Sequence, residues 1–108
     1  MSRPYSEGFL IALGKANPNR AGTALAKACV DARLPTKYVA WALEVSRMTV
    51  FSWFRGKPIR HKNLLKVETL TDLIESDTAK GLLPAKNVAA AVKYLEEMVG
   101  RKYEETTA

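Results

Sequence analysis

The chain has 108 residues, of which 47% are hydrophobic, and it carries a formal net charge of +6. That length suits a single domain over residues 1–108, and the hydrophobic content is typical of a folded chain rather than a disordered one. The longest apolar run, residues 9–13, is too short for a membrane span or a secretory signal, so we expect a cytoplasmic protein.

The charge is divided unevenly along the chain. Residues 1–62 hold eleven Lys and Arg against three acids, a net charge of +8, whereas residues 63–108 hold six against eight acids, a net charge of −2. A positive excess in one half predicts either a polyanionic partner or a solvated basic surface. With one cysteine and one histidine there is no basis for a disulfide, a metal site or a Ser/Cys–His catalytic set. We therefore expect no metal, no cofactor and no enzymatic activity, and Cys29 to be a small buried hydrophobe.

Two helices are predicted in the first third of the chain. The first is short, with a cap at Ser6 and an end at residues 14–19, which are rich in Gly, Asn and Pro. The second runs from about residue 20 to 33. It is expected to end there because Pro35 disfavours helical backbone in the residue before it. Their apolar faces comprise Phe9, Leu10 and Leu13 in the first, and Leu25, Ala28, Cys29 and Ala32 in the second.

Residues 36–55 predict two short helices joined by a tight turn. We expect Thr36 to cap the first and Ser46 to cap the second, which ends at Gly56. The inward residues are Val39, Ala40 and Leu43 in the first helix, Val45 in the turn, and Val50, Trp53 and Phe54 in the second. The outward face of the second helix carries Arg47, Met48, Thr49, Phe51, Ser52 and Arg55.

A basic loop at residues 56–62 is predicted next, followed by two further helices. The first of these, at about 63–75, has an apolar face of Leu64, Val67, Leu70 and Ile74. Gly81 and Pro84 separate it from a last helix at about 85–99, and residues 101–108 form a polar tail that we expect to fray. Strand signals are weak. The predicted fold is all-α, a compact bundle of five or six short helices that contains a helix-turn-helix.

The segment 36–57, TKYVAWALEVSRMTVFSWFRGK, resembles the lambda repressor/Cro-like helix-turn-helix family. The resemblance rests on Val39-Ala40, Leu43, Val45-Ser46-Arg47, Thr49-Val50, Trp53 and Arg55-Gly56-Lys57. It extends to residues 19–75 if the flanking helices pack as they do in that family. The chain departs from the family at Glu44, where a glycine is usual, so this residue must take a left-handed conformation at a cost of about 1 kcal/mol. It also departs at Phe54, where a polar residue is common; its bulk predicts packing against the fifth helix or a partner.

The resemblance implies sequence-specific binding of double-stranded DNA by a transcriptional regulator, such as a repressor, of bacterial or phage type. Such a protein would be found at the nucleoid, or in the host cytoplasm if a phage encodes it. The second motif helix, about 46–55, would lie in the major groove. Ser46, Arg47, Met48, Phe51 and Ser52 would then face the bases, with Arg47 suited to guanine. The alternative for Arg47 is a phosphate contact or a solvated side chain, and the alternative for Phe51 is a position in the core.

Phosphate contacts are expected on both sides of that helix, from Thr36, Lys37, Arg55, Lys57, Arg60, His61 and Lys62. Plain solvation is the alternative for Arg60 and Lys62, and a simple loop position for His61. A single module of this kind buries only about 600–1,000 Å² on DNA, so a homodimer is expected. Its interface would be the last helix, through Val88, Val92, Leu95 and Val99, unless this stripe packs on the chain's own core.

Two other functions fit the same residues. A DNA-packaging or architectural protein would use these helices with little sequence preference. A small protein-interaction module, such as an inhibitor, would instead present Met48, Phe51 and Phe54 to a protein partner.

Overall fold

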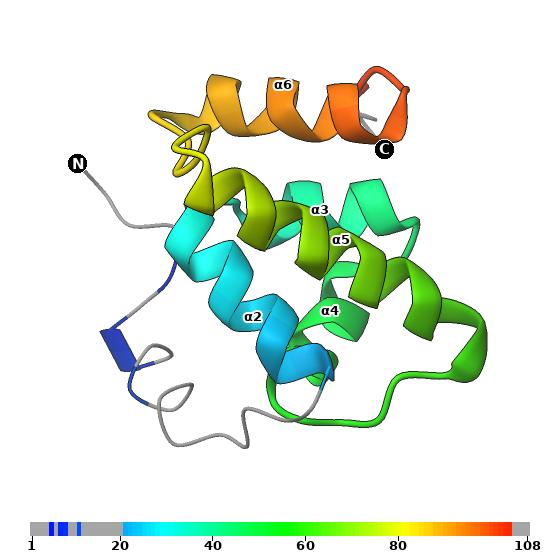
Figure 1. Ribbon diagram of the computed structural model, residues 1–108. Coiled ribbons are helices and arrows are strands. Elements are labelled where there is room, and N and C mark those ends of the chain that lie inside the picture. Colours follow the sequence, from blue (N-terminus) through cyan, green and yellow to red (C-terminus); the bar gives the residue numbers. More distant parts are fainter. Residues whose placement is uncertain (1–4, 6, 9–10, 12–20, 105–108) are drawn as a thin grey trace.

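The computed structural model describes Tyr5, Glu7, Gly8, Ile11 and residues 21–104, and five helices lie wholly within the described residues. They are α2 (Ala21–Ala32), α3 (Thr36–Leu43), α4 (Arg47–Phe54), α5 (His61–Ala79) and α6 (Val88–Val99) (Figure 1). These residues contain no strand, which confirms the predicted all-α class. Glu7, Gly8 and Ile11 are helical, as the helix predicted from Ser6 requires, whereas Ser6 and its apolar residues Phe9, Leu10 and Leu13 lie outside the described residues.

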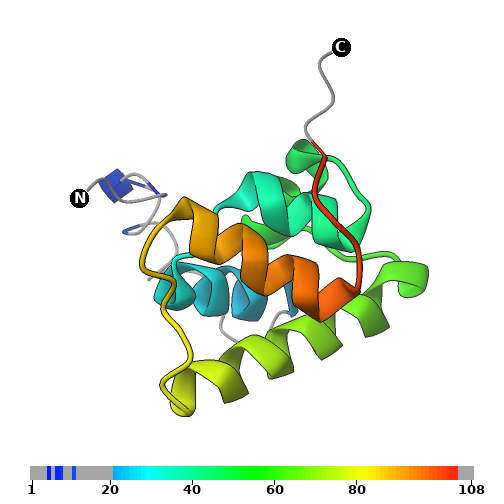
Figure 2. The ribbon, with the colours of Figure 1, turned by 90° about the horizontal axis from the view of Figure 1, so that it is seen from above.

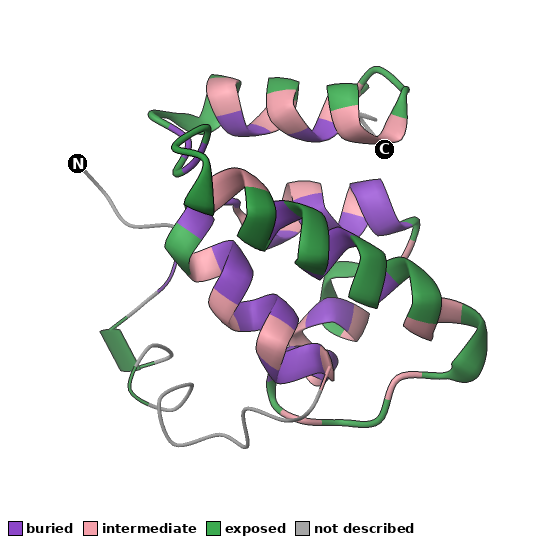
Figure 3. Cartoon of the chain, viewed as in Figure 1, coloured by how far each residue is buried: buried purple, intermediate pink, exposed green. Residues whose placement is uncertain are grey.

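The helices form a bundle in which α2 contacts α4 and α5, and α3 contacts α4 and α6. Figures 1 and 2 show α6 as a separate layer lying over the other helices. Most of α2 is buried, whereas one side of α5 faces solvent along its whole length (Figure 3). The predicted inward residues of α2 to α5 are confirmed except Val45 and Leu64, which are only half-buried: Leu25, Ala28, Cys29, Ala32, Val39, Ala40, Leu43, Val50, Trp53, Phe54, Val67, Leu70 and Ile74 are buried.

The end of α2 is set by a left-handed residue rather than by proline alone. Arg33 has a φ of 57°, and the N–H of Leu34 donates to the carbonyl of Cys29 at 3.0 Å. This bond and the burial of Leu34 are the features of a Schellman end. Cys29 is fully buried, as predicted, and burial raises the pKa of its thiol, which keeps it protonated and inert.

The approach of α2 to α4 depends on Gly22. A Cβ atom at this position would lie 2.2 Å from the carbonyl oxygen of Trp53. Because that oxygen belongs to the backbone of α4, the two helices can be this close only if residue 22 has no side chain. Gly22 therefore sets the position of α4 against the core.

Helix α5 is longer than the sequence predicts, and α6 is shorter. Arg60 takes the N-cap position of α5 without a side-chain bond, and the helix continues beyond Glu75 to Ala79. In this extension the Thr78 hydroxyl donates to the Ile74 carbonyl at 2.8 Å. Because the residues of the extension are mostly polar, they show no apolar periodicity from which a helix could be predicted. Helix α6 begins only at Val88, because the Asn87 side chain accepts the Ala90 N–H at 2.8 Å and so caps it there.

The apolar stripe of α6 is divided between core and surface. Leu95 is fully buried, Val92 and Val99 are half-buried, and Val88 is 53% exposed. Because α6 contacts α3 through this side, Leu95 belongs to the core of its own chain. The predicted dimer face therefore does not exist as a continuous exposed stripe.

The residues directly after α6 do not fray as predicted. The ring of Tyr103 lies edge-on to the rings of Tyr38 and Trp41, at centroid distances of 5.0 and 5.4 Å. Its N–H donates to the carboxylate of Glu96 at 2.8 Å. Tyr103 thus packs on α3, and the rest of the predicted tail, 105–108, lies outside the described residues.

Candidate nucleic-acid interface

The connection between α3 and α4 consists of residues 44–46. Glu44 takes the left-handed conformation expected from the sequence, with φ 61° and ψ 41°. Its N–H donates to the Trp41 carbonyl at 3.1 Å, and the N–H of Val45 donates to the Ala40 carbonyl at 3.1 Å. These bonds end α3 sharply and turn the chain into α4, which is consistent with the predicted helix-turn-helix.

Two cations from distant parts of the chain bind the carbonyl end of α3. The Lys66 ammonium donates to the Leu43 carbonyl at 3.0 Å, and the Arg101 guanidinium donates to the carbonyls of Trp41 and Ala42 at 3.3 and 3.4 Å. Arg101 also lies 4.9 Å from the centre of the Trp41 ring. Positive charge is favourable at a helix C-terminus, so both residues stabilise the turn. Neither contact is predictable from the sequence, because Lys66 is 23 residues from its partner in the chain and Arg101 is 60 from Trp41.

Ser46 caps α4, as predicted. Its hydroxyl oxygen accepts the Thr49 N–H at 3.1 Å and lies 2.8 Å from the Thr49 hydroxyl. The cap fixes where α4 begins and places Arg47 in the first helical position. It also engages the Ser46 side chain within the protein, which leaves this hydroxyl less able to read a base.

The outward face of α4 brings together four of the residues predicted for DNA contact. Val50, Trp53 and Phe54 face the core, and the opposite side presents Arg47, Met48, Ser52 and Arg55. Met48 is 80% exposed, which is the highest value among the exposed large hydrophobic side chains of the described residues. Ser52 is half-buried, and both arginines are exposed.

Phe51 is placed between the core and the surface. It is half-buried, and its ring lies edge-on to Phe54 at 6.2 Å. Phe54 in turn is buried with its ring 6.4 Å from that of Tyr5. Much of the Phe51 ring is therefore part of the packing, and only its outer part remains for contact with a ligand.

The remaining predicted phosphate contacts follow α4 along the chain. Lys57, Arg60, His61 and Lys62 are all exposed. Lys57 and Arg60 lie in the connection to α5, but His61 and Lys62 belong to the first turn of α5 and not to a loop as predicted. Between Val45 and Val67 the chain carries six Lys and Arg and no acid, so the charges of this segment are all positive.

Thr36 does not occupy its predicted position. Pro35 is the N-cap residue of α3, and Thr36 is a buried first residue whose hydroxyl donates to the Tyr5 hydroxyl at 3.2 Å. Tyr5 donates in turn to the Leu34 carbonyl at 2.8 Å, and burial raises the pKa of Tyr5, so it remains a donor. The Thr36 side chain is therefore unable to bind phosphate. Lys37 is half-buried, with its ammonium 5.6 Å from the centre of the Tyr38 ring.

Among the described residues, His, Cys, Asp and Glu form no group able to hold a metal ion, and none of the helices is long and apolar enough to cross a bilayer. No protein-family model, curated protein or solved structure matches this chain. Its function must therefore be inferred from its own residues.

Proposed function

We propose that the chain is a sequence-specific, double-stranded DNA-binding transcriptional regulator that places α4 in the major groove. The observation that carries this proposal is the outward face of α4. A short helix, capped by Ser46 and held on three buried residues, presents Arg47, Met48, Ser52 and Arg55 within a stretch that lacks acids. A major groove about 12 Å wide accepts one helix, and such a face offers it both cations and small groups.

In this arrangement the N-terminal turn of α4 meets the bases. Arg47 is exposed there, and its guanidinium can bond O6 and N7 of a guanine together, which is worth about 1–3 kcal/mol of discrimination. Met48 supplies an apolar contact for a thymine methyl group. Arg55, Lys57 and Arg60 follow in the chain and are placed to bind phosphates, which orients the helix without reading sequence.

The test is selection of binding sites from random DNA duplexes by the purified chain, followed by fluorescence anisotropy on the selected site. We expect a defined motif. Arg47→Ala should lose about 10- to 100-fold in affinity for that motif and much less for unrelated DNA. Lys93→Ala is the matched control, because it removes an exposed cation from α6 and should leave binding unchanged.

Two results would overturn the proposal. Salt-sensitive binding with no selected motif would favour an architectural DNA-binding protein. Absence of binding at about 50 mM salt, where phosphate contacts are strong, would exclude both DNA functions and favour a protein-interaction module.

A further inference from the structure

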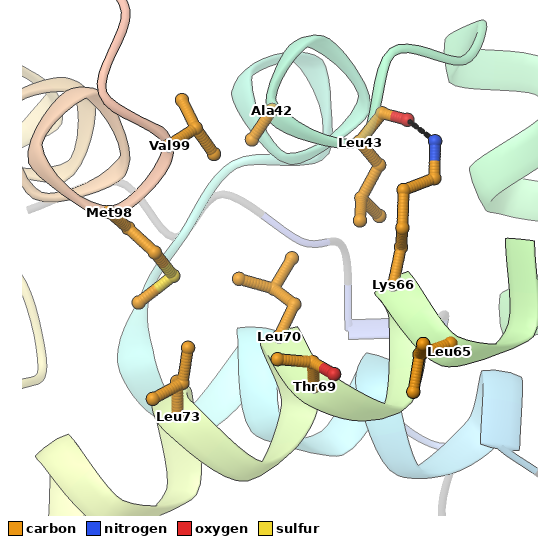
Figure 4. Close-up of a pocket in the computed structure, with 9 residues that line it drawn as sticks. All are labelled: Ala42, Leu43, Leu65, Lys66, Thr69, Leu70, Leu73, Met98 and Val99. Atoms are coloured by element: carbon orange, nitrogen blue, oxygen red, sulfur yellow. Dashed lines mark hydrogen bonds between the residues drawn. The ribbon is translucent and has the colours of Figure 1, made fainter.

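An apolar groove of about 340 Å³ lies where α3, α5 and α6 meet. Its walls are formed by Leu43 of α3, Leu70 and Leu73 of α5, and Met98 and Val99 of α6 (Figure 4). Small-molecule sites often lie between the helices of a bundle, with mostly apolar walls and volumes of about 300–1,000 Å³. A groove with walls from three helices therefore suits a small molecule better than a flat protein surface.

The charges at one end of this groove are mainly positive. Lys66 is the one charged side chain among the described residues that line it, and its bond to the Leu43 carbonyl leaves two N–H groups for a ligand. Arg101 binds the carbonyl of Ala42 at the same helix end, and the Glu44 carboxylate lies 4.0 Å from it. These three side chains have a net charge of +1, which exceeds the partial charge of about −0.5 at the end of α3. A ligand with one negative charge is favoured there.

We propose that the groove binds a small amphipathic monocarboxylate, with its carboxylate on Lys66 and its hydrocarbon chain against Leu70 and Met98. At about 30 Å³ for each non-hydrogen atom, the volume of one water molecule in the liquid, the groove holds about 11 such atoms, the size of a straight-chain carboxylate of about eight to ten carbons. The chain would also cover parts of Leu65 and Leu73, which are 74% and 44% exposed. The inference is independent of DNA binding.

Chain length gives the first test, in an NMR titration of the isotope-labelled chain with butanoate, octanoate, decanoate and dodecanoate at neutral pH. The amides of the residues that line the groove should shift and saturate, with a Kd for octanoate below about 1 mM. Each methylene group that the groove buries should lower Kd by up to about fourfold. The gain should stop near decanoate, because the groove is then full.

Octanol tests the charge, because it has the chain of octanoate and no carboxylate. Lys66→Met keeps an apolar side chain of similar length and should lower the ratio of octanoate affinity to octanol affinity about fivefold. The two ligands are compared on the same variant, so the lost bond to Leu43 does not affect this ratio. Lys80→Met, at an exposed lysine directly after α5, is the matched control and should leave the ratio unchanged.

A second pair of variants tests the apolar wall. Leu73→Asp places a negative charge in the groove and should weaken octanoate binding at least 10-fold. Leu82→Asp changes an exposed leucine in the α5–α6 connection, away from the groove, and should leave binding unchanged. Circular dichroism melting of each variant shows that it is folded.

Four results would each contradict this inference. The first is the absence of saturable shifts at the groove up to about 10 mM octanoate. The second is an affinity that still rises from decanoate to dodecanoate, which indicates unspecific adsorption. The third is an unchanged affinity ratio in Lys66→Met. The fourth is a set of amides at the groove that shift with protein concentration and not with octanoate, since a second copy of the chain would then occupy it.

Discussion

The exposed sides of α4 and α5 lie over the same core but differ in their pattern of charge. The side of α4 and the connection after it carry cations only, with no acid between Val45 and Val67. The side of α5 carries Lys66 and Asp72 at equal distances from Thr69, with a leucine beside each. A surface of one sign suits a polyanion, whereas a surface that mixes both signs does not.

The largest effect is expected from a substitution between α2 and α4, because it disturbs the core on which both surfaces lie. Gly22→Ala places a Cβ against the Trp53 carbonyl of α4, and neither backbone can move without opening the core. We expect a loss of about 3 kcal/mol in the free energy of unfolding, and a fall in Tm of about 12 °C, in thermal and urea denaturation. Gly8→Ala is the control, because a Cβ there meets nothing within 4 Å. An unchanged Tm for Gly22→Ala would contradict the close contact between α2 and α4.

The next largest effect is expected in the salt dependence of DNA binding, which concerns the α4 surface only. Each phosphate contact releases about one counterion, so Arg60→Ala should reduce the slope of log K against log[salt] by about 1. The affinity should fall to a similar degree on every DNA sequence, since phosphates carry no sequence information. Lys86→Ala, at an exposed cation just before α6, should leave the slope unchanged. Equal slopes for the two variants would remove Arg60 from the proposed interface.

Local signals in the sequence predicted the α3–α4 unit well. Ser46 caps α4, Glu44 takes the left-handed turn, and Val50 and Trp53 face the core, each as its residue type and spacing indicate. These features depend on neighbours within about one helical turn, and the backbone rules for such distances are strong. The α4 side of the candidate site could therefore be predicted almost completely from the sequence.

Contacts between distant residues were not predictable in this way. Thr36 looks like a cap, but Tyr5, 31 residues earlier, buries its hydroxyl. Arg101 and Tyr103 look like a frayed tail, but α3 offers them its C-terminal carbonyls and two aromatic rings. Helical periodicity reports which side of a helix is buried and gives no information on which element buries it.

A smaller effect is expected at the caps of α4 and α6. Ser46→Ala and Asn87→Ala each remove a side chain that accepts a backbone N–H, and each should cost about 1 kcal/mol of stability. Only Ser46→Ala should also weaken DNA binding, because its cap fixes the first turn of the proposed reading helix. Urea denaturation and anisotropy measure the two quantities. A similar loss of DNA affinity in both variants would mean that general stability, and not the start of α4, controls binding.

The smallest effect concerns the turn that leads into α4, and a pair of substitutions at Glu44 isolates it. Both Glu44→Ala and Glu44→Gly remove the carboxylate that lies 4.0 Å from Arg101, an exposed pair worth about 0–1 kcal/mol. They differ only in the Cβ, which is unfavourable at a φ of 61° by about 1 kcal/mol. Glu44→Gly should therefore be more stable than Glu44→Ala by up to about 1 kcal/mol in urea denaturation, somewhat less because glycine also gains freedom in the unfolded chain. If Glu44→Ala were instead more stable than Glu44→Gly, as alanine is at ordinary backbone angles, residue 44 would not be held in the left-handed conformation, and the geometry that aims α4 outward would have to be different.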